Sequence, residues 1–357
     1  MNKEIAIIAP ANVKYVPYIN NYFDVLNSLN RHYYTISWDK IGLDEDVEYA
    51  MHYTVADEDR KKMLLGYLKF AQFCKKIIKK NGTKKIIILT AAPAFFLGLS
   101  FLRNNDYILD IRDDSPLIRL AKIYFSKICR YADKVVVSSP NFRPWVCRES
   151  ILCHNADMTL IRNCRQLPVK KADEEPYTIV FAGMMNEASE NMRFLQKLDG
   201  DNRFSHIYYG RTNPEKELIE EYAKKKNLKN ISFYGTYNKE EIIDIYRKHA
   251  SVVNIIREKS EVNRNALPNK LYDAVFSGVP ILVYDHNEAI SYYVNKYHLG
   301  IVLKEETDDL GDYLYNSIAS FDYVQYSEGR ISFMNEIQQD MQKFASSVTI
   351  FSKRSIQ

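Results

Sequence analysis

A proline, an asparagine and a lysine in succession lie within a segment whose residue types suit the binding of a diphosphate. The segment is 263–282, with the sequence NRNALPNKLYDAVFSGVPIL. Pro268 is favoured in the first turn of a helix, where its missing N–H costs nothing. Backbone donors at Asn269 and Lys270 would then lie at the positive end of the helix dipole, which is a natural anion site. A diphosphate near this helix start and a ribose near Asp273, one turn further along, would fit this geometry.

Apolar runs that predict β-strands alternate with helical patterns, and the alternation restarts in the second half of the chain. The runs are at 5–9, 33–37, 84–89, 107–111 and 134–138, and then at 178–183, 206–210, 230–235, 251–256, 280–284 and 300–303. They are almost continuously hydrophobic, as in a parallel sheet covered on both faces. The alternation with helices indicates right-handed βαβ crossovers and an α/β fold of two doubly wound sheets. Ligands bind such sheets at the carboxyl ends of the strands, so the loops that follow strands are the candidate sites.

The predicted boundary between the two domains is the polar stretch 166–177, QLPVKKADEEPY, which holds two prolines. We therefore expect an N-terminal Rossmann-like domain at 1–166 and a C-terminal one at 177–330. The remainder, 331–357, is expected to be a helix and tail. By analogy with other two-domain folds of this sort, that helix packs back on the first domain.

The segment 263–282 resembles the donor-site signature of the family 4 glycosyltransferases and their capsule-cluster relatives. In that signature a P-N-K-L-[FY]-E-type helix is followed by a small residue, a glycine and Pro-[IV]. Further passages are similar to that family: TIVFAG at 178–183, the run 210–237, LDIRDDSPL at 109–117 and HNADM at 154–158. The resemblance spans nearly the whole chain and is stronger in the C-terminal half.

This resemblance implies a GT-B fold, with two Rossmann-like domains facing a cleft. It also implies an enzyme that transfers a sugar from a nucleotide-diphosphate sugar to a saccharide acceptor, with retention of configuration. The acceptor would be carried on a polyprenyl diphosphate, in the synthesis of a bacterial capsule, exopolysaccharide or O-antigen. We expect a cytoplasmic protein attached peripherally to the inner face of the plasma membrane.

The resemblance also assigns roles to residues of this sequence. The catalytic set is Arg112, Asp113, Asn265 and Lys270. The nucleotide-sugar set is Gly183, Arg211, Gly235, Thr236, Tyr237, Arg264, Leu267, Pro268, Asn269 and Asp273. Asp273 would hold the ribose, and the backbone at 235–237 would frame the base. Asp273 and the catalytic set also have plainer interpretations: a surface helix residue for Asp273, a solvated helix start for Lys270, a turn residue for Asn265 and helix caps for Arg112 and Asp113.

Two departures from the family pattern concern charge. The family has two acidic residues eight positions apart, and here the first position is Asn265, which keeps hydrogen bonding but loses the charge. The family also has an arginine just after the first strand of the second domain and a lysine about five residues on. The corresponding loop, 183–191, reads GMMNEASEN and has neither. Lys270, Arg264, Arg257 or Arg211 could replace these cations.

The departing diphosphate is an anion, so the enzyme must stabilise it with donors, cations or helix dipoles. No D-x-D motif is present in a context that suits metal-bound phosphate. We therefore expect protein cations in place of a metal, and no cofactor. Two other functions stay open: a nucleotide-sugar epimerase or hydrolase on the same fold, and a non-catalytic sugar-binding relative.

Charge is unevenly distributed between the halves of the chain. The net charge is +4, and the stretch 60–85 carries ten Lys and Arg and no acid. A solvated outer helix explains this stretch, and so does attraction to an anionic membrane surface. No nucleic-acid motif accompanies the charge, so we expect no nucleic-acid partner. The five cysteines form no C-x-x-C pair, which favours free thiols.

Overall fold

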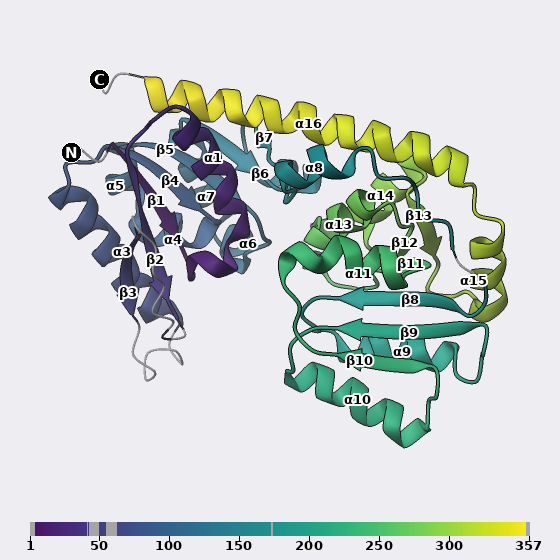
Figure 1. Cartoon of the computed structure of the whole chain (residues 1–357). Helices are drawn as coiled ribbons and strands as arrows, with labels where there is room; N and C mark the ends of the chain where they lie inside the picture. Colours follow the sequence, from purple (N-terminus) through teal and green to yellow (C-terminus); the bar gives the residue numbers. More distant parts are fainter. Residues whose placement is uncertain (1–3, 41, 43–49, 55–62, 173, 355–357) are drawn as a thin grey trace. The chain divides into compact units, whose positions relative to one another are not determined.

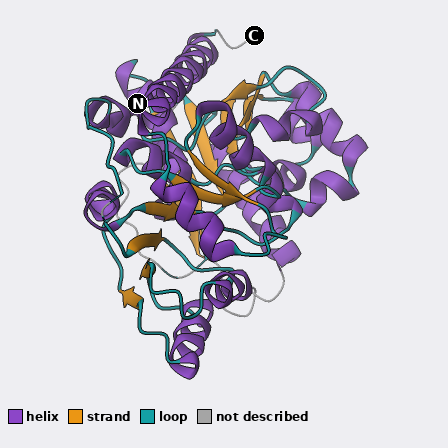
Figure 2. Ribbon diagram, turned by 90° about the vertical axis from the view of Figure 1, so that its right-hand side faces the viewer, coloured by secondary structure: helices purple, strands orange, loops and turns teal. Residues whose placement is uncertain are grey.

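The structure, a computed structural model, describes residues 4–40, 42, 50–54, 63–172 and 174–354. Two compact units are present: Met1–His154 together with Gln339–Gln357, and Asn155–Gln338. Each contains one parallel sheet with helices packed around its strands (Figures 1 and 2). Arg60, Lys61 and Lys62 of the basic stretch lie outside the described residues.

The first unit contains a seven-stranded sheet in the order β3-β2-β1-β4-β5-β6-β7. Its strands are β1 (Ile5–Ala9), β2 (Tyr33–Asp39), β3 (Ala50–Thr54), β4 (Lys85–Leu89), β5 (Asp106–Ile111), β6 (Lys134–Val137) and β7 (Ile151–Leu152). Its helices are α1 (Asn20–Ser28), α3 (Met63–Lys80), α4 (Ala91–Leu97), α5 (Leu99–Arg103), α6 (Pro116–Leu120) and α7 (Lys122–Tyr131). Every residue of β1 and β4 is buried, which explains why β1, and β4 after Lys85, have unbroken apolar sequences.

The second unit contains a six-stranded sheet in the order β10-β9-β8-β11-β12-β13. Its strands are β8 (Tyr177–Ala182), β9 (Phe204–Tyr209), β10 (Ile231–Tyr234), β11 (Val252–Asn254), β12 (Ile281–Tyr284) and β13 (Gly300–Leu303). Its helices are α8 (Met158–Cys164), α9 (Ala188–Lys197), α10 (Pro214–Lys226), α11 (Ile242–His249), α12 (Glu261–Asn265), α13 (Asn269–Ser277), α14 (Glu288–Tyr297) and α15 (Leu310–Ala319). The strand order reverses between β8 and β11, which makes their carboxyl ends the expected place for a ligand.

Helix α16 (Tyr323–Lys353) contributes to both units, because its residues from Gln339 onward belong to the first. In the first unit Phe344 is buried and packs edge-to-face on Tyr22, with ring centroids 4.9 Å apart. The stretch 166–177, expected to be a linker, lies within the second unit, where the Lys170 N–H donates to the Gly278 carbonyl at 2.9 Å. No helix in the described ranges is both long and apolar enough to cross a membrane.

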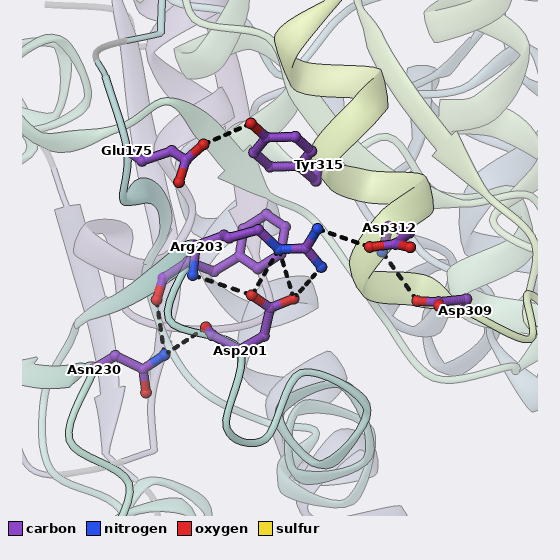
Figure 3. A network of polar contacts seen from close by, with 8 residues as sticks. Glu175, Asp201, Arg203, Asn230, Asp309, Asp312 and Tyr315 are labelled. Carbon is purple, nitrogen blue, oxygen red and sulfur yellow. Dashed lines mark hydrogen bonds and ion pairs between the residues drawn. The ribbon is translucent and has the colours of Figure 1, made fainter.

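Arg203 lies at the amino end of β9, in a network of polar contacts in the second unit (Figure 3). Its guanidinium donates to the Asp201 carboxylate at 2.7 Å and to Asp312 of α15 at 2.7 Å. Asn230, just before β10, donates to the Phe204 carbonyl at 2.7 Å. These contacts join the turns before β9 and β10 to α15, so this edge of the sheet has a structural role.

Candidate functional site

A cavity of about 140 Å³ opens at the carboxyl ends of β8 and β11, where the strand order reverses. Its lining comes from the end of β8 and the loop that follows, from the residues after β11, and from the start of α13. These residues are Phe181, Met184, Asn186, Glu187, Asn191, Ile255, Ile256, Arg257, Pro268 and Lys270. The structure therefore places the predicted Pro268 and Lys270 at the edge of the sheet where ligands bind in doubly wound folds.

The start of α13 presents backbone donors at this cavity. Pro268 is the N-cap, in an extended conformation with φ −74° and ψ 157°, and its side chain makes no capping hydrogen bond. The first N–H groups of a helix have no partner within the helix, and they carry the positive end of its dipole. The nine-residue helix α13 thus offers an anion the donors of Asn269 and Lys270.

The Lys270 side chain lies over an aromatic ring beside a glycine. Its Nζ is 3.4 Å from the centroid of the Phe181 ring, a cation–π arrangement. A Cβ at Gly183 would be 3.0 Å from Lys270 Cε, and Gly183 has φ +134°, so the predicted Gly183 makes room for the amine. Burial lowers the pKa of Lys270 to about 7, with Arg257 lowering it further and Glu187 and Asp273 opposing the shift. An arriving anion would favour the protonated form of this amine.

The Glu187 carboxylate forms hydrogen bonds and an ion pair with the segment that follows β11. Its Oε1 accepts from Asn263 Nδ2 at 3.0 Å, and its Oε2 accepts from the Glu258 N–H at 2.9 Å. The same carboxylate lies 3.4 Å from Arg257 Nε. Glu187 thereby orients Arg257, a cation of the cavity lining, toward the same space as Lys270. Sequence reasoning considered Arg257 as a replacement cation but missed Glu187.

Asn191 is a second residue that the sequence did not single out. It is buried in the first turns of α9 and lines the cavity. Its Nδ2 donates to the Glu187 carbonyl at 2.9 Å, while its Oδ1 has no hydrogen-bond partner among the residues that the structure describes. A buried acceptor of this kind suits a ligand hydroxyl. The only sequence signal was its place in the loop and helix directly after the first strand of the second unit.

Asp273 lies one turn beyond Lys270, near Lys239 from the turn before α11 and Asp157 from the start of α8. Burial raises the pKa of Asp273 to about 7; Lys239 lowers it, and Asp157 raises it. Burial also raises the pKa of Tyr237 to about 12, and the Asp273 charge adds to that shift. Tyr237 and Asp273 therefore lie near enough for the Asp273 charge to affect the Tyr237 hydroxyl, and their assignment to the base and the ribose stays a prediction.

Three other predicted residues of the second unit are not part of the cavity lining. Arg264 is half exposed and pairs with Glu288 of α14 at 2.8 Å. Asn265 donates to the Glu261 carbonyl at 3.0 Å within α12. Arg211 is exposed, with Nη2 3.6 Å from the sulfur of Met184, so it reaches the loop after β8.

The remaining residues of the predicted set differ in exposure. Leu267 is buried and its carbonyl accepts from Asn155. Gly235 and Thr236 are exposed after β10. The structure therefore brings only part of the predicted nucleotide-sugar set to the cavity.

Arg112 belongs to a buried cluster in the first unit. Its Nε lies 2.7 Å from Asp110 Oδ1, and Nη1 donates to the Cys153 carbonyl at 2.9 Å. The Tyr18 ring covers the guanidinium, with its centroid 4.4 Å from Arg112 Cζ. These contacts account for Arg112 as part of the core, and its catalytic role stays a prediction. Asp113 adds to the raised pKa of Tyr18, and its own role likewise stays a prediction.

No family model matches the sequence, and no curated protein matches it. Solved structures match it over nearly the whole length. Sucrose-phosphate synthase from Thermosynechococcus elongatus is 15% identical, with a TM-score of 0.71 over 96% of this chain and 98% of that one. A glycosyltransferase from Rickettsia africae ESF-5 is 14% identical, with a TM-score of 0.65 over 99% and 100%.

Anabaena HepE in complex with UDP is 12% identical, with a TM-score of 0.63 over 97% of this chain and 100% of that one. At these identities the similarity is one of fold. The predicted fold class is confirmed: the chain has the α/β architecture of the GT-B glycosyltransferases, with two Rossmann-like parallel sheets.

Proposed function

We propose that this protein is a glycosyltransferase that uses a nucleotide-diphosphate sugar as donor. The observation that carries the proposal is the half-buried Lys270 amine at the start of α13, in a cavity where the strand order reverses. Arg257 lines the same cavity. Fold neighbours support the donor class, since HepE structures were determined with UDP and with UDP and glucose.

The residues suit the stabilisation of a leaving diphosphate. The bond from the anomeric carbon to the diphosphate oxygen breaks, and the electron pair leaves with the nucleoside diphosphate. Lys270, Arg257 and the N–H groups of α13 would neutralise that charge in a partly desolvated cavity. Asp273 would hold the ribose hydroxyls, and Asn191 Oδ1 would accept from a hydroxyl of the ligand.

In a retaining reaction the acceptor oxygen bonds to the anomeric carbon on the face from which the diphosphate departs. The acceptor proton then passes to a phosphate oxygen. This step needs no protein carboxylate as base, which is consistent with an asparagine at position 265, where the family has an acid. No protein residue is therefore assigned to proton removal.

We further propose a saccharide acceptor linked to polyprenyl diphosphate, in bacterial surface polysaccharide synthesis. Support comes from the first unit. Basic residues line α3, among them Lys75, Lys76 and Lys79, and two apolar side chains are strongly exposed at α6 and α7: Leu120 at 85% and Ile123 at 79%. Basic and apolar groups together favour contact with an anionic bilayer. On this basis the protein would act at the inner face of the plasma membrane.

Turnover of a panel of nucleotide-sugars with lipid extract as the acceptor source tests the proposal. The wild type should release nucleoside diphosphate in an acceptor-dependent manner, and K270M should lose this activity. K225M, the same substitution on the exposed side of α10, is the matched control and should retain it. Equal turnover by K270M and wild type would refute the site assignment.

A non-catalytic sugar-binding relative is the second candidate. The observation that favours it is the loop after β8, which presents Met184 and Glu187 to the cavity and no cation. Binding of a nucleotide-sugar without release of nucleoside diphosphate, under every acceptor, is its expected result. An epimerase or hydrolase would instead convert the nucleotide-sugar when no acceptor is present.

A further inference from the structure

A second cavity lies at the carboxyl ends of β12 and β13, within the second unit. Its volume is about 440 Å³, in the range of small-molecule sites. The loop after β12 supplies Asp285 and His286, the loop after β13 supplies residues 304–307, and Lys259 completes the lining. Its lining residues are distinct from those of the first cavity.

The His286 side chain lines this cavity, and its Nδ1 atom has no hydrogen-bond donor among the described residues. Its side chain is only 9% exposed, and its Nε2 lies 2.8 Å from the Arg257 carbonyl oxygen. Since a carbonyl only accepts, Nε2 carries the proton in the neutral imidazole, and Nδ1 is left as an acceptor. Nδ1 is buried and has no hydrogen-bond partner in the described part of the chain.

The neighbouring carboxylate cannot supply the donor. Glu305 Oε2 lies 3.7 Å from His286 Nδ1, and an ionised carboxylate only accepts. Its other oxygen lies 3.6 Å from Arg193 Nη1. When the imidazole is neutral, two acceptors therefore lie side by side in the lining of the cavity, and a buried acceptor without a donor costs free energy of folding. A ligand that brings hydroxyl donors into the cavity would remove that cost.

The remaining lining defines the charge of that ligand. Two ammonium groups, Lys259 and Lys304, stand with three carboxylates, Asp285, Glu305 and Glu306. The carboxylates disfavour a phosphate. In the described ranges no group of three His, Cys, Asp or Glu side chains is arranged to hold a metal ion. The lining suits a neutral ligand that both donates and accepts hydrogen bonds.

We propose that this second cavity binds a neutral saccharide. Sugar hydroxyls donate to His286 Nδ1 and to the Glu305 carboxylate, and sugar oxygens accept from Lys259 and Lys304. Arg257 links the two cavities, because its side chain lines the first while its carbonyl fixes His286 in the second. The inference does not depend on the nucleotide-sugar function, since sugar binding is measured without nucleotide.

The test uses the full-length protein and four probes at millimolar concentration: the methyl glycosides of glucose, galactose, mannose and N-acetylglucosamine. Saturation-transfer NMR and calorimetry should detect binding of at least one. H286Q retains an amide donor for the Arg257 carbonyl and removes the acceptor at Nδ1. Its affinity for that sugar should be about five-fold lower, which corresponds to the loss of one net hydrogen bond.

E305Q provides an independent measurement. A glutamine amide at this position can donate to His286 Nδ1, so the chain itself supplies the missing donor. The melting temperature should stay level or rise, while the affinity for the sugar falls as in H286Q. E221Q, the same change on the exposed side of α10, is the control and should bind the sugar as the wild type does.

Failure to bind any of the four sugars would overturn the proposal, as would unchanged binding in both H286Q and E305Q. In either case water satisfies His286, and the pair serves the fold alone. UDP binding measured on the same samples separates the two sites. If UDP binds and no sugar does, this inference fails while the nucleotide-sugar proposal stands.

Discussion

Substitution of Lys270 should change both the strength and the pH dependence of nucleotide binding. With a pKa of about 7, the free amine is about half protonated at pH 7 and about one-tenth protonated at pH 8. If only the protonated form binds a diphosphate, the apparent affinity scales with that fraction. UDP should therefore bind about five-fold more weakly at pH 8 than at pH 7.

Two variants separate the charge from its titration. K270M keeps an apolar stem over Phe181 and loses the cation, so affinity at pH 7 should fall about ten-fold or more, as for a lost charge-assisted hydrogen bond. K270R keeps a cation that does not titrate in this range, so its affinity should vary less with pH. Asp273 and the nucleotide phosphate titrate in both proteins, so the difference between wild type and K270R isolates the amine.

Isothermal titration calorimetry with UDP between pH 6 and 9 measures these effects. In buffers of different ionisation enthalpy, the wild type should take up about half a proton at pH 7 and about 0.9 at pH 8 on binding, beyond any uptake by K270R. K225M should match the wild type. Equal pH profiles for wild type and K270R would refute the assignment of Lys270 to the diphosphate.

Three further substitutions test the same unit. The raised pKa of Asp273 means that the folded carboxyl keeps a proton which the unfolded chain releases, so stability falls as pH rises from about 4 to about 7. D273N should flatten that part of the profile of melting temperature against pH, and should weaken UDP binding. E187Q should move the midpoint of the UDP pH profile to lower pH, because the Glu187 charge raises the pKa of Lys270. G329A should destabilise the protein in chemical denaturation, because the new Cβ would lie 1.7 Å from the Tyr297 carbonyl oxygen. Such overpacking costs about 1–3 kcal/mol or more, against a helix-propensity gain of about 1 kcal/mol.

The features predicted correctly from the sequence are local ones. The apolar runs of β1, β4 and β12 are buried strands, and Pro268 with Gly278 brackets a helix that begins at a cavity. A helix cap, a turn or a hydrophobic periodicity depends on a few neighbouring residues, so it can be predicted from the sequence. Strands β3 and β7 are not among the predicted runs, and the two residues of β7 are too few to show a period.

The contacts that could not be predicted join distant parts of the chain. Glu187 acts on Arg257, Glu258 and Asn263, about seventy residues further on. Arg112 follows a strand, a position that favours a site residue, yet its buried guanidinium pairs with Asp110 and donates to the Cys153 carbonyl, 41 residues further on. The side chain at Asp110 faces inward, and only the packed unit shows that the charge of Arg112 is already matched.

The division of α16 between the units has a consequence for the order of folding. The ribosome makes β1 to β7 first. Phe344 packs on Tyr22, and the Ser352 carbonyl accepts from the Lys85 ammonium at 2.8 Å. Both Phe344 and Ser352 are translated only after the entire second unit. The nascent first unit must wait with part of its hydrophobic surface open to solvent or to a chaperone. A nonsense mutation before Phe344 would therefore harm the half of the protein farthest from it in sequence.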